Sequence, residues 1–153
     1  MRLHALAIAT LTAFAGAAQA APIDWNTWTS TTAGAIATTG GPVGVGFAGD
    51  PISLQTPYPS YTPAPTFADG TVVDNAPVAA NGIIQLFGGN DHVNTVTFST
   101  AVVDPVMAIW SLGQGGIDAR FDFIGATPTF ISGGPSAEYG GSPIVVAGNS
   151  VSG

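Results

Sequence analysis

Three charged residues alternate along one short stretch of the chain, at Asp118, Arg120 and Asp122. Residues two apart on a β-strand share a face, so these side chains would project from the same side. A pair of carboxylates on one face is the arrangement used in glycoside hydrolysis. However, Arg120 would lower the pKa of both carboxyl groups, whereas a general acid needs a raised pKa. We therefore expect a structural role, in which Arg120 neutralises the two carboxylates, and we call these three residues the charge ladder.

A second candidate for chemistry is the segment Gly88–His92, with the sequence GGNDH. It resembles one turn of the calcium-binding nonapeptide repeat, but that architecture needs several stacked copies. A single copy favours a hairpin turn. Asn90 and Asp91 could still supply oxygen ligands to one Ca²⁺, an ion that takes roughly 6–8 of them. His92 has no further candidate ligands at zinc-site spacing.

Other catalytic and polyanion-binding signatures are missing from the sequence. There is no Gly-x-Ser-x-Gly motif, and the glycine-rich segments have no lysine that could hold a phosphate. The only basic residues besides histidine are Arg2 and Arg120, which argues against binding of nucleic acid. We expect a protein that is not an enzyme.

Aromatic side chains give a binding hypothesis instead. Flat rings can stack on pyranose rings, and the candidates outside the strongest predicted strands are Trp25, Trp28, Tyr58, Tyr61 and Tyr139. Trp25 and Trp28 are three apart, so on a strand they face opposite ways and one belongs to the core. Tyr58 and Tyr61 lie in the proline-rich segment Asp50–Asp69, where they could equally pack this loop onto the domain. The alternative function is therefore a carbohydrate-binding module for neutral or cationic polysaccharide.

The elements that must position these residues are short runs of β-branched and aromatic residues between glycine and proline. They predict an all-β fold, a two-sheet antiparallel β-sandwich of Greek-key or jelly-roll type. The expected strands are Ile23–Ser30, Ala35–Thr39, Val43–Ala48, Ile83–Phe87, Val93–Thr100, Val106–Leu112, Ala119–Ile124, Thr129–Ser132 and Ile144–Ala147.

Two of these strands should dominate the core. Val93–Thr100 alternates, with Val96 and Phe98 on one face, and Val106–Leu112 is apolar almost throughout, as in a central strand. Their short connection predicts an antiparallel pair. The prolines of Asp50–Asp69 allow no central strand there. The predicted core residues are Val96, Phe98, Val106, Ala108, Ile109, Trp110, Phe121 and Phe123.

Length and composition predict one exported domain. Residues Met1–Ala20 have a basic start, an apolar centre and an Ala-x-Ala cleavage signal, which is typical of a signal peptide. The domain is then Ala21–Gly153, without cysteine and, having lost Arg2, one unit more negative than the −7 of the full chain. Such an acidic surface repels anionic polymers.

A resemblance to a known family rests on the second half of the chain. The residues that carry it are Asp104–Gln114 (DPVMAIWSLGQ), Phe121–Phe123, Ser132–Pro135, Tyr139–Gly141 and Gly148–Asn149. This part resembles the secreted PEP-CTERM proteins, bacterial envelope proteins sorted by an exosortase. The resemblance implies a signal peptide, a β-rich ectodomain, and a tail with a Pro-Glu-Pro signal, a hydrophobic helix and a basic cluster.

None of these three tail features is present, and a further strand is expected to begin at Ser150. We therefore expect a fragment that lacks its C-terminal strands and sorting tail, with no membrane span in the mature part and a C-terminal anchor missing. The resemblance implies the cell envelope or extracellular matrix of a Gram-negative bacterium, including biofilm exopolysaccharide. The expected function is that of a non-enzymatic surface or exopolysaccharide-matrix protein, and no catalytic residues carry over.

Overall fold

The structure is a computed structural model that describes residues 20, 22–57, 73–88, 92–113, 115–135 and 141–153. The predicted signal peptide therefore lies outside the described residues except for Ala20. The described elements are β1 (Thr27–Trp28), β2 (Ala33–Ile36), β3 (Val43–Ala48), β4 (Pro51–Gln55), the 3-10 turn η2 (Ala79–Asn81), β5 (Ile83–Leu86), β6 (Thr95–Phe98), β7 (Arg120–Asp122), β8 (Val145–Ala147) and β9 (Ser150–Ser152).

A four-stranded antiparallel sheet, in the order β1-β2-β3-β6, contains the most buried strand of the described chain. Val45 and Phe47 of β3 point to one face and are buried. Directly paired residues of neighbouring strands share a face, so Phe98, opposite Val45, and Val96, opposite Phe47, lie on the same side. We call this side the inner face.

The opposite side, the outer face, carries only small side chains. The pairs Ala35–Gly44, Ala33–Gly46 and Gly46–Thr97 belong to it, because they alternate with the inner residues along each strand. Its residues are Thr27, Ala33, Ala35, Gly44, Gly46, Ala48, Thr95, Thr97 and Ser99. This face is therefore flat, and most of its residues are exposed.

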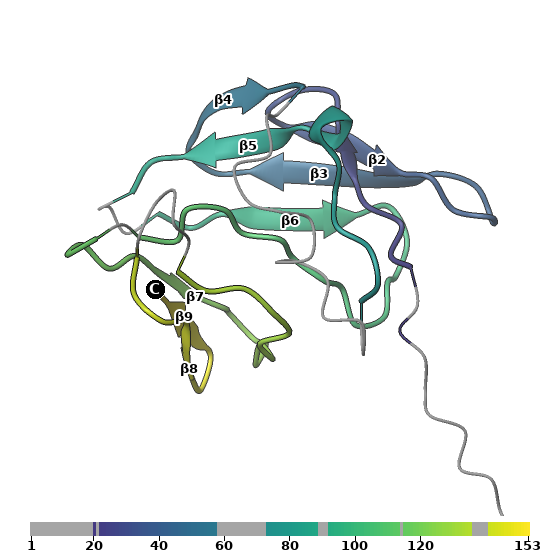
Figure 1. The fold of residues 1–153 in the computed structure, drawn as a ribbon. Coiled ribbons are helices and arrows are strands. Elements are labelled where there is room, and N and C mark those ends of the chain that lie inside the picture. The colour runs from purple at the N-terminus through teal and green to yellow at the C-terminus, as the bar shows by residue number, and fades with distance from the viewer. Residues whose placement is uncertain (1–19, 21, 58–72, 89–91, 114, 136–140) are drawn as a thin grey trace, which may run out of the picture.

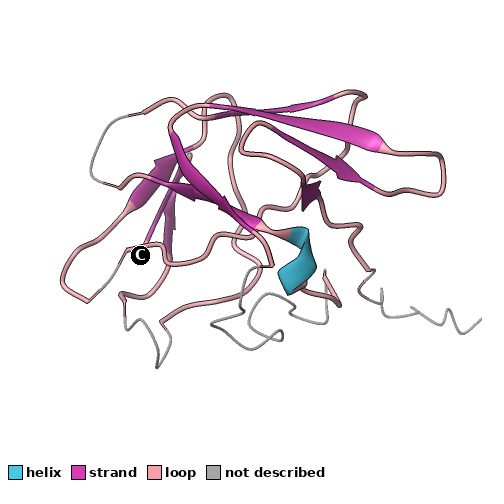
Figure 2. Ribbon diagram, turned by 90° about the horizontal axis from the view of Figure 1, so that it is seen from above, coloured by secondary structure: helices cyan, strands magenta, loops and turns pink. Residues whose placement is uncertain are grey.

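The remaining strands form two smaller antiparallel sheets, one of β4 and β5 and one in the order β7-β9-β8. In Figure 1 the two-stranded sheet lies at the top, the four-stranded sheet crosses the middle, and the three-stranded sheet lies at the lower left beside the C-terminus. Figure 2 shows that η2 is a short helical turn among strands and long loops. The fold is all-β, with antiparallel sheets in a sandwich-like arrangement, as the sequence predicts.

Several predicted strands are confirmed. β3 has the predicted bounds, Val43–Ala48, and the strand expected at Ser150 is β9, the middle strand of its sheet. The proline-rich segment contributes β4, whose one partner among the described strands is β5, so it is not a central strand of a described sheet. No helix among the described residues has the length and apolar character needed to cross a membrane.

The prediction for Val106–Leu112 is wrong, because these residues form no strand and β6 pairs with β3 instead. Pro105 removes a backbone donor at the start of the run. Asp104 and Ser111 have left-handed φ angles of 46° and 54°, which interrupt an extended backbone at both ends. Thr129–Ser132 also forms no strand, and only Thr27–Trp28 of the expected Ile23–Ser30 does so.

The predicted core also needs correction. The buried apolar residues of the described chain are Val45, Phe47 and Val73, none of which was predicted. Val96 lies on the inner face but is 36% exposed. The other predicted core residues are only half-buried: Phe98, Val106, Ala108, Ile109, Trp110, Phe121 and Phe123.

Candidate functional site

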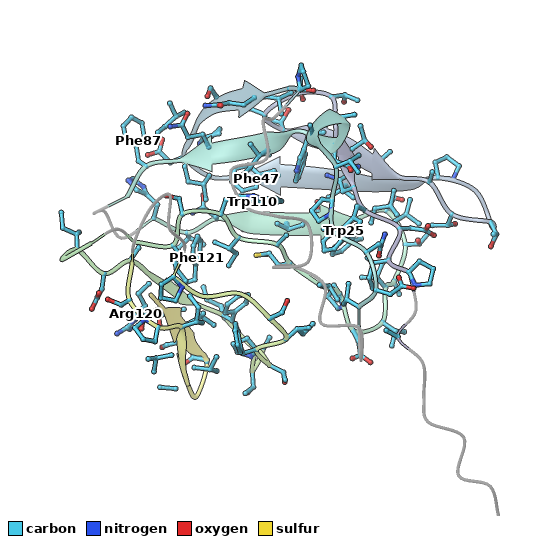
Figure 3. All side chains as sticks on the ribbon, viewed as in Figure 1. Trp25, Phe47, Phe87, Trp110, Arg120 and Phe121 are labelled. Atoms are coloured by element: carbon cyan, nitrogen blue, oxygen red, sulfur yellow. The ribbon has the colours of Figure 1, made fainter. Side chains whose placement is uncertain are left out.

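One hollow lies where the segment before β1 meets the outer face of the four-stranded sheet. It is an open groove with a volume of about 450 Å³, within the roughly 300–1,000 Å³ of small-molecule sites. We call it the Trp25 groove, after the one aromatic residue in its lining; Trp25 is labelled in Figure 3. The sheet contributes Thr27 and Ala35, the connection from β2 to β3 contributes Ala37 and Pro42, and the other segments contribute Ile23, Asp24, Trp25, Asn75, Ala76, Val78 and Asn81.

Two asparagines hold the Trp25 segment in place. The amide of Asn75 accepts a hydrogen bond from the Ile23 N–H at 2.6 Å and donates one to the Ile23 carbonyl at 2.9 Å. This side chain thus does what a neighbouring strand would do for Ile23. Asn81 donates to the Asn26 carbonyl at 3.2 Å and to Thr27 Oγ1 at 3.0 Å, and it accepts from the Val78 N–H at 2.9 Å.

The two tryptophans face opposite ways, as their spacing predicts. Trp28 pairs with Gly34, and its ring contacts Phe47 edge to face on the inner side. Trp25 lines the groove instead. Trp28 therefore belongs to the packing, and Trp25 is the tryptophan that can meet a ligand.

Trp25 offers the groove its ring rather than its N–H. The side chain is half-buried, but its Nε1 is fully covered and has no hydrogen-bond partner among the described residues. The exposed part of the indole is therefore carbon surface. Such a surface suits stacking against another flat or weakly polar ring.

A second, shallower hollow of about 350 Å³ continues along the outer face over β2, β3 and β6. Its outward-facing lining is Ala33, Gly44, Gly46, Thr97 and Ser99. The glycines leave room for polar side chains close to the backbone. Ser99 Oγ accepts a hydrogen bond from the Gly44 N–H at 2.9 Å. Thr97 Oγ1 lies so near Gly46 that a Cβ there would stand only 2.6 Å from it.

The ladder at Arg120 lies on a different part of the molecule, as the separated labels in Figure 3 show. Arg120 donates from Nε and Nη2 to the two carboxylate oxygens of Asp122, at 2.8 and 2.5 Å, and Ser150 donates to Asp122 as well. The hydrogen bonds from Arg120 and then Ser150 lower the pKa of Asp122. Asp118 accepts from Ser142 Oγ at 3.0 Å.

The candidate metal ligands Asn90 and Asp91 lie outside the described residues. Their neighbour His92 is described, and its Nε2 lies 3.2 Å from Asp50 Oδ2 with both side chains about two-fifths exposed. Within the described ranges no three His, Cys, Asp or Glu side chains gather in a way that could hold a metal ion.

The three candidate tyrosines, Tyr58, Tyr61 and Tyr139, also lie outside the described residues. The sequence analysis did not select Asn75 or Asn81, although both contribute to the groove. The turn signal Asn81-Gly82 was available, and Gly82 does take a left-handed φ of 69°. The contact of Asn75 with Ile23, 52 residues away, has no local signal.

Comparisons with protein-family models, with curated proteins and with solved structures find no match to this chain. The resemblance to PEP-CTERM proteins therefore stays a prediction.

Proposed function

We propose that this chain is a non-enzymatic, exported domain that acts at the cell envelope or in the exopolysaccharide matrix of a Gram-negative bacterium. The observation that carries the non-enzymatic role is the bidentate contact of Arg120 with Asp122. Asp122 is one of the two carboxylates considered for acid–base chemistry, and its contact with Arg120 lowers its pKa. A general acid at neutral pH needs a raised pKa instead. The pattern of Met1–Ala20 supports export.

Export is tested by producing the full chain in a Gram-negative host and measuring the intact mass in each cell fraction. We expect a form that begins at Ala21 outside the cytoplasm. The matched control is Ala20→Arg, which places a large charged residue at the cleavage site and should leave the chain at full length. Wild-type protein that stays uncleaved in the cytoplasm would contradict the proposal.

The non-enzymatic role is tested by incubating the exported protein with glucan, mannan and galactan and measuring new reducing ends. We expect none above a blank without protein. Release of reducing ends that disappears in Asp122→Asn would show that the ladder is catalytic and would reject the proposal.

A second candidate function, binding of neutral polysaccharide, is favoured by the Trp25 groove. The groove combines the carbon surface of an indole ring with short polar side chains such as Thr27 and Asn75. Flat rings for stacking and short side chains for hydroxyl groups suit a sugar ring. The negative net charge of the chain does not penalise a neutral glycan, whereas it repels an anionic one.

Retention on gels of immobilised glucan, mannan and galactan tests this candidate. Trp25→Ala should reduce retention at least tenfold, and Trp25→Phe, which keeps a ring, should retain part of it. The thermal midpoint of each variant shows whether the fold persists. A folded Trp25→Ala variant retained like the wild type would exclude the groove, and the pair Tyr58→Ala and Tyr61→Ala would then test the tyrosines.

A further inference from the structure

The Trp25 groove and the second hollow are parts of one surface. A single row of paired residues crosses the sheet from β1 to β6: Thr27 pairs with Ala35, Ala35 with Gly44, and Gly44 exchanges hydrogen bonds with Ser99. The first two of these residues line the groove and the last two line the second hollow. No side chain larger than threonine stands between them in this row.

We propose that this outer face binds a linear, neutral polysaccharide chain of several sugar units, which lies across the four strands with one end on Trp25. The inference rests on the second candidate function and specifies the form of its ligand. A site for a single sugar would need only the groove. The second hollow gives the same face a path that continues away from Trp25.

The dimensions of the sheet support a ligand longer than one ring. Neighbouring strands lie roughly 4.8 Å apart, so the axes of β1 and β6 are separated by about 14 Å. Trp25 precedes Thr27 by two residues and therefore projects from the same side of an extended chain. The path from Trp25 to Thr97 and Ser99 is thus diagonal and longer than the width of the sheet.

The chemistry along the path suits hydroxyl-rich ligands. Thr27, Thr97 and Ser99 each carry a hydroxyl, which has one donor and two acceptor positions. Ser99 Oγ accepts from the Gly44 N–H, and Thr27 Oγ1 accepts from Asn81, so each keeps its own O–H for a further partner. The glycines and alanines between them let a ligand approach the backbone closely.

The charge along the path favours a neutral chain. None of the outward-facing residues of the row or of the second hollow is ionisable. Asp24, at the Trp25 end, is the only ionisable residue among the described residues that line the groove. With a chain that is negative overall, an anionic polymer would be repelled along the whole path.

Affinity as a function of ligand length tests the inference. The probes are soluble β-linked oligomers of glucose, mannose and galactose, from one to eight units, titrated by calorimetry into the exported protein. We expect the dissociation constant for the best-bound sugar to fall at least tenfold between two and six units. Oligomers of uronic acid of the same lengths should bind at least tenfold more weakly.

A variant that blocks only the second hollow separates the two proposals. Ala33→Ile adds bulk to the exposed, outward-facing side of β2 without adding a ring, a charge or a hydrogen-bonding group. It should bind six-unit oligomers only as tightly as the wild type binds two units. The matched control is Ala147→Ile, which makes the same change at an exposed alanine of β8 in another sheet and should bind like the wild type.

Each outcome has a distinct meaning. If the wild type binds oligomers but the affinity does not depend on length, or if Ala33→Ile changes nothing, the extended path is wrong while the groove remains a sugar site. If the wild type binds none of the oligomers, both proposals fail. Tighter binding of uronic acid oligomers would reject the neutral class.

Discussion

The rings of Trp28 and Phe47 meet edge to face, with centroids 6.3 Å apart and ring planes at 88°. This contact joins β1, at the edge of the four-stranded sheet, to β3, two strands away. Gly34 of β2 lies between them as the paired residue of Trp28. Trp28 therefore fixes the short strand β1, and with it the segment that carries Trp25.

Trp28→Ala should lower the free energy of unfolding by about 2–4 kcal/mol, somewhat less than a fully buried tryptophan would cost, because Trp28 is half-buried. Urea denaturation followed by circular dichroism measures this loss. Trp25→Ala should cost less, because its ring lines an open groove. Equal losses for the two variants would contradict the division into packing and binding roles.

Asn75→Ala should lower the free energy of unfolding by about 1–3 kcal/mol, because it leaves the Ile23 N–H and carbonyl without their partner in a part-buried place. The matched control is Asn149→Ala, which removes one exposed hydrogen bond, to the Phe123 carbonyl, and should cost below about 1 kcal/mol. Asn75→Ala should also weaken sugar retention if the groove binds as proposed. A loss no larger than that of the control would mean that Asn75 does not hold the segment.

Two glycines of the same sheet should respond to alanine with opposite signs. A Cβ on Gly34 would stand 2.6 Å from Asn26 Oδ1 and 2.8 Å from the backbone oxygen of Thr27, so Gly34→Ala should destabilise the fold by about 1–3 kcal/mol. A Cβ on Gly44 would meet Ser99 at an ordinary 3.5 Å. Gly44→Ala should therefore raise the free energy of unfolding by up to about 1 kcal/mol, because alanine lowers the conformational entropy of the unfolded chain. Thermal midpoints of both variants measure the signs, and equal signs would contradict this geometry.

The ladder at Asp122 makes stability depend on pH in acid. The pKa of Asp122 is lowered in the folded state, so the unfolded chain binds its proton first as the pH falls. The stabilisation is present at neutral pH and is lost progressively below about pH 4. Asp122→Asn should therefore lower the thermal midpoint at pH 7 but reduce its further drop between pH 5 and pH 2.5.

The control for this pH series is Asp74→Asn, which changes an exposed carboxylate that makes no hydrogen bond within the described part of the chain. It should leave the acid branch of the pH profile as steep as in the wild type. If the thermal midpoint of Asp122→Asn depends on pH as that of the wild type does, Arg120 and Ser150 do not stabilise the folded state through Asp122.

The sequence by itself determined the all-β class, the bounds of β3, and the opposite directions of Trp25 and Trp28. Each of these follows from local information: glycine and proline end short β-branched runs, and a period of two fixes which side chains share a face. It also predicted that Arg120 pairs with the carboxylates two residues away, and the structure shows this contact with Asp122.

Only the tertiary structure decided which runs became strands and where the core lies. A strand exists through hydrogen bonds to a neighbouring strand. β6 pairs with β3, and the apolar run Val106–Leu112 forms no strand. Burial likewise depends on what covers a residue, which placed Val73 in the core and left Val96 partly exposed. The Trp25 groove had no local signal for the same reason, because Ile23 and Asn75 meet across 52 residues of chain.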